Sequence, residues 1–343
     1  MEPTSQYYNT IKMKFALTFV ILLVFSIYHN NNASPTSIRT FEEFKRQFNK
    51  QYQSIEHEEI ARKNFQETLQ YVQANQDKAV INEYADLSAE EFADGYLMNV
   101  QDVQDLEAEM DAHKEYFDDP DCELHGDFNP PKEFDLRPHL TPIKKQIKNC
   151  GCCWALSTIS CVETAYLAQK NVSLQLSTQE LVNCAKEHGC KKGTVLDGIE
   201  YIMANGTTTE EACPFISEES TCDQSKNPRY EISNWCYFKP VEDDIRKNLV
   251  LRRTSVSVSM NIKNLKAFVH YDGSFVIREN SFPSIGNKSY HAVNIVGFGT
   301  KDDIDHWIVR NSWGEKWGDK GYFYVERDIN LWGIKDWAFT TIV

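Results

Sequence analysis

The sequence predicts an α+β fold with two lobes of different secondary structure, preceded by a separate helical segment. Apolar residues recur at three- and four-residue spacing through residues 38–76, and again through 154–170, 178–186 and 194–205, which indicates helices. From Val256 onward the pattern changes to short stretches rich in Val, Ile and Tyr, which indicates strands. Helices followed by a mostly antiparallel sheet favour two lobes, each built mainly from one kind of element.

The N-terminal region has the order of a secretory signal. Two lysines precede the apolar run Phe15–Ile27, and a polar stretch that ends at Ala33 follows it. The run is too short to span a bilayer easily. We therefore expect residues 1–33 to be a signal peptide, with Met13 as an alternative start. We expect secretion to the extracellular space or a digestive lumen, by a route that can include an acidic compartment, and no membrane partner.

Negative charge is concentrated in the segment after the signal. Residues 34–120 carry 20 acidic and 8 basic side chains, a net charge of −12, whereas the remaining 223 residues carry 29 and 26, a net charge of −3. Neither part has a basic patch, which argues against nucleic acid as a partner. The acidic helical stretch Val100–Tyr116 is typical of a solvated, mobile face. It leads into Asp118, Asp119 and Pro120, where we place a domain boundary.

The cysteines indicate an oxidising environment. All ten lie between Cys122 and Cys236, and together with a secretory signal they favour disulfide bonds. No pair of CxxC motifs has the spacing of a zinc site, so we expect neither a metal nor another cofactor. Asn171, Asn205 and Asn287 begin N-x-S/T sequences and are candidate glycosylation sites.

Four residue types needed for thiol catalysis occur in a consistent order. Cys153 follows a Cys/Gly-rich loop at the start of a predicted helix, where the helix dipole favours a thiolate. His291 opens a predicted strand and supplies a base, and Asn311 can orient its ring while Trp313 shields that hydrogen bond. Gln146 and the Cys153 backbone N–H can stabilise an oxyanion. Each residue alone is more often a core residue, so the prediction depends on their combination.

The motifs around these residues resemble those of the papain family, and within it the group 1 mite allergen proteases. The run that begins at Cys150, Cys-Gly-Cys-Cys-Trp, differs at one position from the family's Cys-Gly-Ser/Ala-Cys-Trp/Tyr. His291 and Asn311 follow Cys153 by 138 and 158 residues, close to the expected range of roughly 130–150. Further matches lie in the blocks Tyr290–Phe298, Trp307–Asp319, Glu180–Cys184 and Asp197–Tyr201.

The resemblance implies a two-lobed papain-like fold, with a mainly helical left lobe and a right lobe like an antiparallel β-barrel. It also implies a cysteine endopeptidase that hydrolyses peptide bonds and is made as a zymogen. Gly193 would offer its backbone to the substrate, Val195 and Ala292 would line an apolar pocket, and Trp313 would border the substrate site. Its expected partners are protein or peptide substrates, its own propeptide as an inhibitor, and cystatin-like inhibitors.

The acidic segment is similar to a cathepsin L-type propeptide. The matching helical positions are Glu58, Arg62, Phe65 and Val72, and a second motif is matched by Asn82, Tyr84 and Asp86. Thr68, Gln76 and Val80 depart from the usual residues of these motifs. The resemblance implies that residues 34–120 are an inhibitory propeptide that lies along the cleft of a peptidase domain, residues 121–343. Acid would neutralise some of its carboxylates and allow cleavage near residues 115–121.

The resemblance also implies three disulfide bonds, Cys150–Cys190, Cys184–Cys222 and Cys122–Cys236. Cys161 is expected to be a small core residue. Cys213 is either another unpaired thiol or the partner of Cys161, and the sequence leaves both alternatives open.

Three departures from the family pattern concern the site itself. Gln146 precedes Cys153 by seven residues where the family has six, so the loop that aims the oxyanion donor is longer. Cys152 replaces a small residue and could form a vicinal disulfide with the nucleophile. Lys192 stands where the family often has glycine. The sequence therefore predicts an active endopeptidase, with a catalytically weakened relative that binds peptides or inhibitors as the alternative.

Overall fold

A computed structural model describes residues 38–112, 119–124, 128–147, 150–238, 242–284 and 288–343. The predicted signal peptide lies outside these residues. The chain divides into two compact units, which are described separately. The first includes the described residues up to Gln76 together with Val80–Asp86, and the second consists of Asp77–Ala79 and Leu87–Val343. The expected boundary near residue 120 lies within the second unit.

The described residues of the first unit form the helices α2 (Phe41–Gln47) and α3 (Ile55–Ala74). The continuous helical pattern predicted for residues 38–76 is interrupted between them, where Asn49 adopts a positive φ of 50°. The aromatic ring of Phe65 packs against those of Phe41 and Phe44 at 5.7 and 5.0 Å between centroids. A helical motif spaced along one face of α3 therefore builds the small core of this unit.

Both propeptide motifs have a structural role within the first unit. Arg62 pairs with Glu42 at 2.9 Å and with Glu58 at 3.3 Å, and its guanidinium lies 4.4 Å from the centre of the Phe41 ring. The buried carboxylate of Asp86 accepts hydrogen bonds from Lys50 Nζ and the Tyr52 hydroxyl, both at 2.9 Å. The buried charge is therefore paired, as a carboxylate out of water requires.

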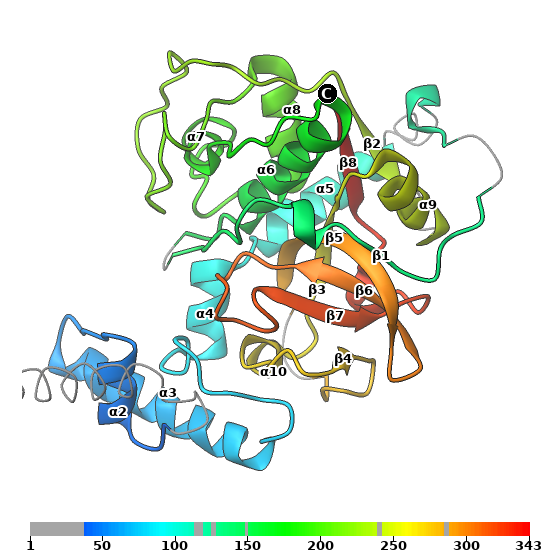
Figure 1. Cartoon of the computed structure of the whole chain (residues 1–343). Helices are drawn as coiled ribbons and strands as arrows, with labels where there is room; N and C mark the ends of the chain where they lie inside the picture. The colour runs from blue at the N-terminus through cyan, green and yellow to red at the C-terminus, as the bar shows by residue number, and fades with distance from the viewer. Residues whose placement is uncertain (1–37, 113–118, 125–127, 148–149, 239–241, 285–287) are drawn as a thin grey trace, which may run out of the picture. The chain divides into compact units, whose positions relative to one another are not determined.

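The second unit contains the predicted helical and strand lobes (Figure 1). Its helices are α4 (Ala89–Tyr96), α5 (Val100–Ala112), α6 (Cys153–Ala165), α7 (Thr178–Cys184), α8 (Val195–Asn205), α9 (Glu242–Lys247) and α10 (Leu265–Val269). Its strands are β1 (Phe134–Asp135), β2 (Asn234–Phe238), β3 (Val256–Asn261), β4 (Val276–Ile277), β5 (Tyr290–Lys301), β6 (Ile304–Arg310), β7 (Tyr322–Glu326) and β8 (Ala338–Ile342).

The strands form one sheet in the order β2-β8-β3-β5-β6-β7-β4, with β1 added to β5. Every pairing is antiparallel except that of β4 with β7. The expected antiparallel right lobe is confirmed by this order. Strands β1, β2, β4 and β8 were not predicted. Of these, β1 and β4 are two residues long and carry no period.

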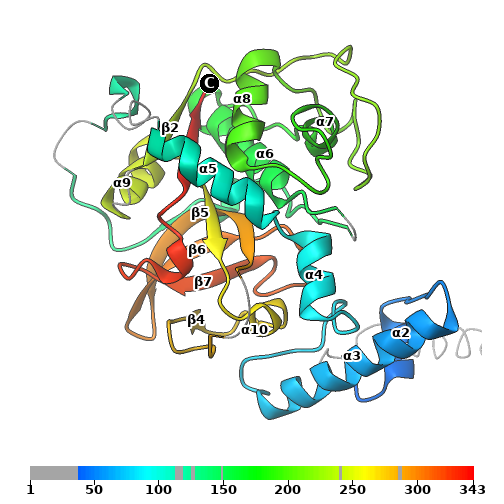
Figure 2. The same ribbon diagram turned by 180° about the vertical axis from the view of Figure 1, so that it is seen from behind.

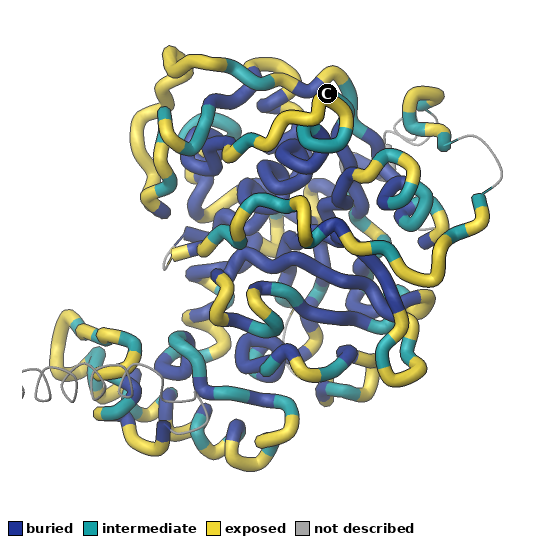
Figure 3. The backbone as a smooth tube through the Cα atoms, in the orientation of Figure 1, coloured by how far each residue is buried: buried dark blue, intermediate teal, exposed yellow. Residues whose placement is uncertain are grey.

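Helix α6 joins the two lobes. Every residue from Cys153 to Ala165 is buried, so the helix has no solvated face and packs on all sides. It lies against β5, β3 and β8 on one side and against α7 and α8 on the other. Figure 3 shows α6 and the central strands as the most continuously buried part of this unit. The first residue of α6 is therefore placed where the two lobes meet.

Helix α5 crosses the surface of the second unit between the helical lobe and the sheet, as the reverse view in Figure 2 shows. The expectation of a solvated, mobile face for this acidic stretch is wrong on one side of the helix. Val103, Leu106 and Met110 are at most 5 % exposed and belong to the same apolar cluster as Trp154. Their spacing of three and four residues was the available signal.

Among the described helices, none has the length and apolar character needed to cross a membrane.

Candidate active site

Cys153 is the first residue of α6, where its side chain meets the free backbone N–H groups of the first turn. A disulfide bond between Cys150 and Cys190 closes the preceding loop, with 4.2 Å between the two Cα atoms. The structure also contains Cys184–Cys222 and Cys122–Cys236, so all three implied disulfide bonds are formed. The Cys150–Cys190 bond holds the loop before α6, Cys184–Cys222 holds the end of α7, and Cys122–Cys236 holds the segment near residue 122 to β2.

Cys152, Cys153, Cys161 and Cys213 are unpaired thiols in the structure. Cys161 is fully buried, in agreement with a core role, and it is not bonded to Cys213. No vicinal disulfide forms between Cys152 and Cys153.

His291 lies near the start of β5, opposite Met260 of β3. Its Nε2 lies 2.8 Å from Oδ1 of Asn311, which follows the last residue of β6. The indole ring of Trp313 stacks on the imidazole with 4.7 Å between centroids. His291 is completely buried, and Asn311 and Trp313 are at most 3 % exposed. The sequence therefore placed these three residues in one cluster correctly.

The hydrogen bonds of Asn311 decide which ring nitrogen of His291 carries the proton. Oδ1 of Asn311 also accepts a 2.8 Å hydrogen bond from the backbone N–H of Ser312. Because an amide N–H can only donate, this bond identifies the atom as the oxygen. His291 Nε2 must then donate to Asn311, which leaves Nδ1 as the basic nitrogen in the neutral ring. Among the described residues, Nδ1 has no hydrogen-bond partner.

Burial favours the neutral forms of Cys153 and His291. It raises the pKa of the Cys153 thiol to about 12, although the backbone N–H groups of Ala292, Trp154 and Met98 act in the opposite direction. Burial also lowers the pKa of His291 to about 4, against the raising effect of the Asn311 hydrogen bond. The thiolate expected from the helix dipole is therefore not the favoured state here, because desolvation outweighs the dipole.

Gln146 is 1 % exposed despite the longer loop. Its Nε2 donates to the carbonyl oxygens of Tyr96 and Cys150, both at 2.8 Å, and its backbone N–H donates to Ser312 at 2.7 Å. The next residue, Ile147, is 51 % exposed. The loop thus turns outward directly after Gln146, and the amide stays in the buried region beside the Cys150 loop.

The segment between α4 and α5 occupies this region. The carbonyl oxygen of Tyr96 accepts a hydrogen bond from Gln146 Nε2. The backbone of Leu97 packs so closely on Gly151 that a Cβ atom there would lie 2.5 Å from the Leu97 carbonyl oxygen. The backbone N–H of Met98 donates to the Tyr290 carbonyl at 3.0 Å and also lies against the Cys153 thiol. Polypeptide therefore covers both the thiol and the amide of Gln146.

Gly193 has a backbone conformation that no other residue could adopt here. Its φ is +128°, and an added Cβ would approach the Trp154 ring to 2.4 Å. Its N–H donates to Asp102 Oδ2 of α5. Val195 and Ala292 are 1 % exposed and share the apolar cluster that contains Met98. The proposed pocket residues therefore lie in the same buried region as the covering segment.

A cavity of about 700 Å³ lies beside this region. Tyr290 and Ser259 line it from the sheet, Trp332 and Trp337 from the C-terminal segment, and Glu107 from α5. Because α5 supplies part of the wall, its removal would widen the cavity.

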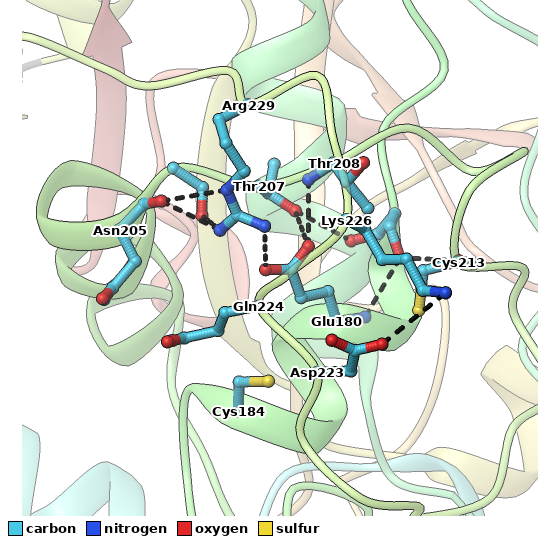
Figure 4. A network of polar contacts seen from close by, with 12 residues as sticks. Glu180, Cys184, Asn205, Thr207, Thr208, Cys213, Asp223, Gln224, Lys226 and Arg229 are labelled. Carbon is cyan, nitrogen blue, oxygen red and sulfur yellow. Dashed lines mark hydrogen bonds and ion pairs between the residues drawn. The ribbon is translucent and has the colours of Figure 1, made fainter.

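A buried ion pair joins α7 to the loops that carry Thr208 and Arg229 (Figure 4). Glu180 is 1 % exposed, and its carboxylate lies 2.7 Å from Arg229 Nη1. The same carboxylate accepts from the Tyr201 hydroxyl and the Thr208 N–H, both at 2.9 Å. Arg229 Nη2 also donates to the Gly206 carbonyl at 2.7 Å. The Glu180–Cys184 motif therefore has a structural role rather than a place in the site.

Two of the candidate glycosylation residues are accessible. Asn171 and Asn205 are exposed, at the ends of helical segments. Asn287 lies outside the described residues.

Comparisons with known proteins agree with the geometry. The family described as papain family cysteine protease matches residues 130–342, and the cathepsin propeptide inhibitor domain matches residues 41–92. The chain is 44 % identical to Peptidase 1 of Dermatophagoides farinae over 96 % of this chain and 100 % of that protein. It is 42 % identical to Peptidase 1 of Dermatophagoides pteronyssinus with the same coverage.

Two solved structures are similar over most of the chain. One comes from a study of antibody cross-reactivity between the mite allergens Blo t 1 and Der p 1, with 29 % identity, a TM-score of 0.72, and coverage of 90 % of this chain and 100 % of that one. The other is digestive procathepsin L2 from the larval midgut of Tenebrio molitor, with 25 % identity, a TM-score of 0.74, and coverage of 88 % and 98 %.

Proposed function

The chain belongs to the papain family of cysteine proteases and carries a cathepsin propeptide inhibitor domain, and from this premise we propose that Cys153, His291, Asn311 and Gln146 form its catalytic site. The observation that carries the proposal is the hydrogen bond between His291 Nε2 and Asn311 Oδ1 at 2.8 Å. It leaves Nδ1 as the nitrogen that can take a proton from the thiol.

The steps of peptide hydrolysis follow from these positions. His291 Nδ1 takes the Cys153 proton, and the thiolate attacks the substrate carbonyl carbon. The developing oxyanion accepts from Gln146 Nε2 and the Cys153 N–H, donors that do not need to reorganise. The imidazolium, held by Asn311, then protonates the leaving amine, and a water molecule releases the acyl group. Gly193, Val195, Ala292 and Trp313 border the substrate.

Latency follows from the segment that covers the site. Tyr96 and Met98 occupy the hydrogen-bonding groups that a substrate would use, and burial disfavours the thiolate–imidazolium pair. We place the inhibitory propeptide at residues 34–120 and the peptidase domain at 121–343, with cleavage near residues 115–121 in acid. Removal of the segment admits water to the site. Water lowers the cost of charge there, so that the thiolate of Cys153 and the imidazolium of His291 can form.

The remaining expectations belong to the same proposal. A signal peptide at residues 1–33 would direct the chain to secretion, and Asn171, Asn205 and Asn287 would carry glycans. Three disulfide bonds support an oxidising destination. Cystatin-like inhibitors are proposed partners, and the mite allergen relative makes an allergen role a proposal as well.

One assay tests the catalytic proposal. Acid-activated protein, in the presence of a thiol reductant, should hydrolyse a fluorogenic peptide with an apolar residue two positions before the scissile bond. Cys153→Ala should abolish turnover and labelling by an epoxide thiol inhibitor. Absence of both turnover and labelling in the unaltered protein would instead favour a binding protein without catalysis. Labelling without turnover would place the defect at Gln146.

A further inference from the structure

A small cavity lies beside Asn311. It is about 10 Å³ in volume and is lined by Arg310, Asn311 and Ser312 at the end of β6, with Lys144, Ser160 and Ala292 among the residues around it. One water molecule requires about 10–15 Å³, so the cavity matches a single water and is too small for a larger anion.

Three polar atoms at this cavity lack partners. Among the described residues, Arg310 Nη1, Asn311 Nδ2 and Ser312 Oγ are buried and make no hydrogen bond. The residues themselves are 3 %, 3 % and 8 % exposed. Buried polar groups are nearly always satisfied by protein or by ordered water. The three residues that carry these unsatisfied atoms all line one water-sized space, which points to one bridging molecule.

The two cationic side chains at the cavity, Lys144 and Arg310, both have protein partners. Lys144 Nζ lies 3.1 Å from the buried carboxylate of Glu163. Arg310 Nη2 donates to the carbonyl oxygens of Thr141 and Pro142 at 2.8 and 2.6 Å, which anchors the guanidinium in the wall of the cavity. Arg310 Nη1 is thereby left as a donor for the cavity.

We propose that this cavity binds one structural water molecule, which accepts hydrogen bonds from Arg310 Nη1 and Asn311 Nδ2 and donates one to Ser312 Oγ. The water anchors the NH₂ end of the Asn311 amide, so that Oδ1 stays directed at His291. Arg310 and Ser312 are thus positioning residues that act through the water. The binding site stands on the geometry alone, whereas its catalytic consequence rests on the proposed role of Asn311.

A high-resolution crystal structure of the Cys153→Ala precursor tests the binding site without reference to activity. We expect density for one water molecule within hydrogen-bond distance of all three atoms, and its loss or displacement in the Ser312→Ala variant. Empty density, or a halide detected by its anomalous signal after growth in bromide, would overturn the proposal.

The pH dependence of the matured enzyme tests the catalytic consequence. The Asn311 hydrogen bond stabilises the imidazolium, so loosening Asn311 should lower the pKa of His291 and move the alkaline limb of kcat/KM to lower pH. One hydrogen bond corresponds to about 0.4–1 pH unit. We expect this shift in Ser312→Ala and Arg310→Met, with KM nearly unchanged, and recovery of most of it in Arg310→Lys, which keeps a donor.

The matched control is Ser255→Ala, which removes a buried hydroxyl that bonds to Thr164 at 2.8 Å, away from the cavity. It should leave the alkaline limb in place. Equal shifts in Ser255→Ala and Ser312→Ala, or no shift in Ser312→Ala, would refute the positioning role. If the unaltered protein proves inactive, the proposed function fails, and the crystal structure alone still decides the binding site.

Discussion

The carboxylate of Asp102 accepts a 2.8 Å hydrogen bond from the backbone N–H of Gly193. Gly193, whose backbone we propose to bind the substrate, lies against the Trp154 ring. Asp102 is in the first turn of α5. A side chain of α5 therefore uses a donor that we propose for the substrate backbone. The contact couples the docking of α5 to the closure of the site.

Replacing Asp102 with alanine should weaken latency. A hydrogen bond to a charged group contributes about 1.5–3 kcal/mol, so the open fraction of the precursor should rise by about 10- to 100-fold. The rate at which uncleaved precursor hydrolyses a fluorogenic peptide measures this fraction. Asp105→Ala is the matched control, because Asp105 is exposed on the same helix and bonds only to Gln101 in the described residues. Equal rates in the two variants would rule out the specific contact.

Gln146→Ala should lower kcat of the matured enzyme by about 10²–10³-fold with little change in KM, because an oxyanion donor acts mainly in the transition state. Steady-state kinetics after acid maturation measure both constants. Ile147→Ala, which alters the exposed residue next to it, should be nearly neutral. A loss below about tenfold in Gln146→Ala would mean that the longer loop holds this amide away from the oxyanion.

His291 should make the precursor less stable in acid. Its pKa is about 4 in the folded state and 6.5 as the ordinary value. Below pH 6.5 the unfolded chain binds a proton that the folded chain excludes, so the free energy of unfolding falls until about pH 4. The difference corresponds to about 3 kcal/mol. Urea denaturation of Cys153→Ala across this range measures the slope.

Adding His291→Gln to that background should remove this part of the slope and leave the contribution of the carboxylates. If the two proteins lose stability in parallel between pH 6.5 and 4, the buried neutral histidine is not a source of acid lability.

Glu180→Ala should destabilise the protein by about 3 kcal/mol, because it leaves the Arg229 guanidinium without its buried partner. Breaking a buried ion pair costs about 3–5 kcal/mol, and we expect the lower end of this range because the Arg229 side chain is 19 % exposed. Chemical denaturation measures the change, and Glu187→Ala, at a carboxylate that is 92 % exposed, is the control. Similar stabilities for the two variants would contradict a structural role for the network.

Denatured, unreduced protein should have four cysteines that react with iodoacetamide: Cys152, Cys153, Cys161 and Cys213. Mass spectrometry counts the added groups, and prior reduction should raise the number to all ten. A count of two, with Cys152 and Cys153 protected, would show the vicinal disulfide that their adjacency permits and would explain any need for reductant.

Much of the site could be predicted from local sequence. The order of the motifs around His291 and Asn311 predicted the hydrogen bond that the structure forms between these two residues. Long periodic segments such as α6 and β5 were also predicted, since their patterns extend over several turns or alternations. The short strands β1 and β4 and the break at Asn49 were not predicted, because segments of only a few residues are too short to show a periodic pattern.

The sequence by itself determined which chemistry the chain can carry: a thiol at a helix start, a base, its orienting amide, and the cysteines for three disulfide bonds. Only the tertiary structure decided the state of that chemistry. The protonated nitrogen of His291, the neutral thiol of Cys153 and the link from Asp102 to Gly193 depend on burial and on contacts between distant segments. Desolvation and hydrogen-bond direction arise only when these segments meet, so no local pattern encodes them.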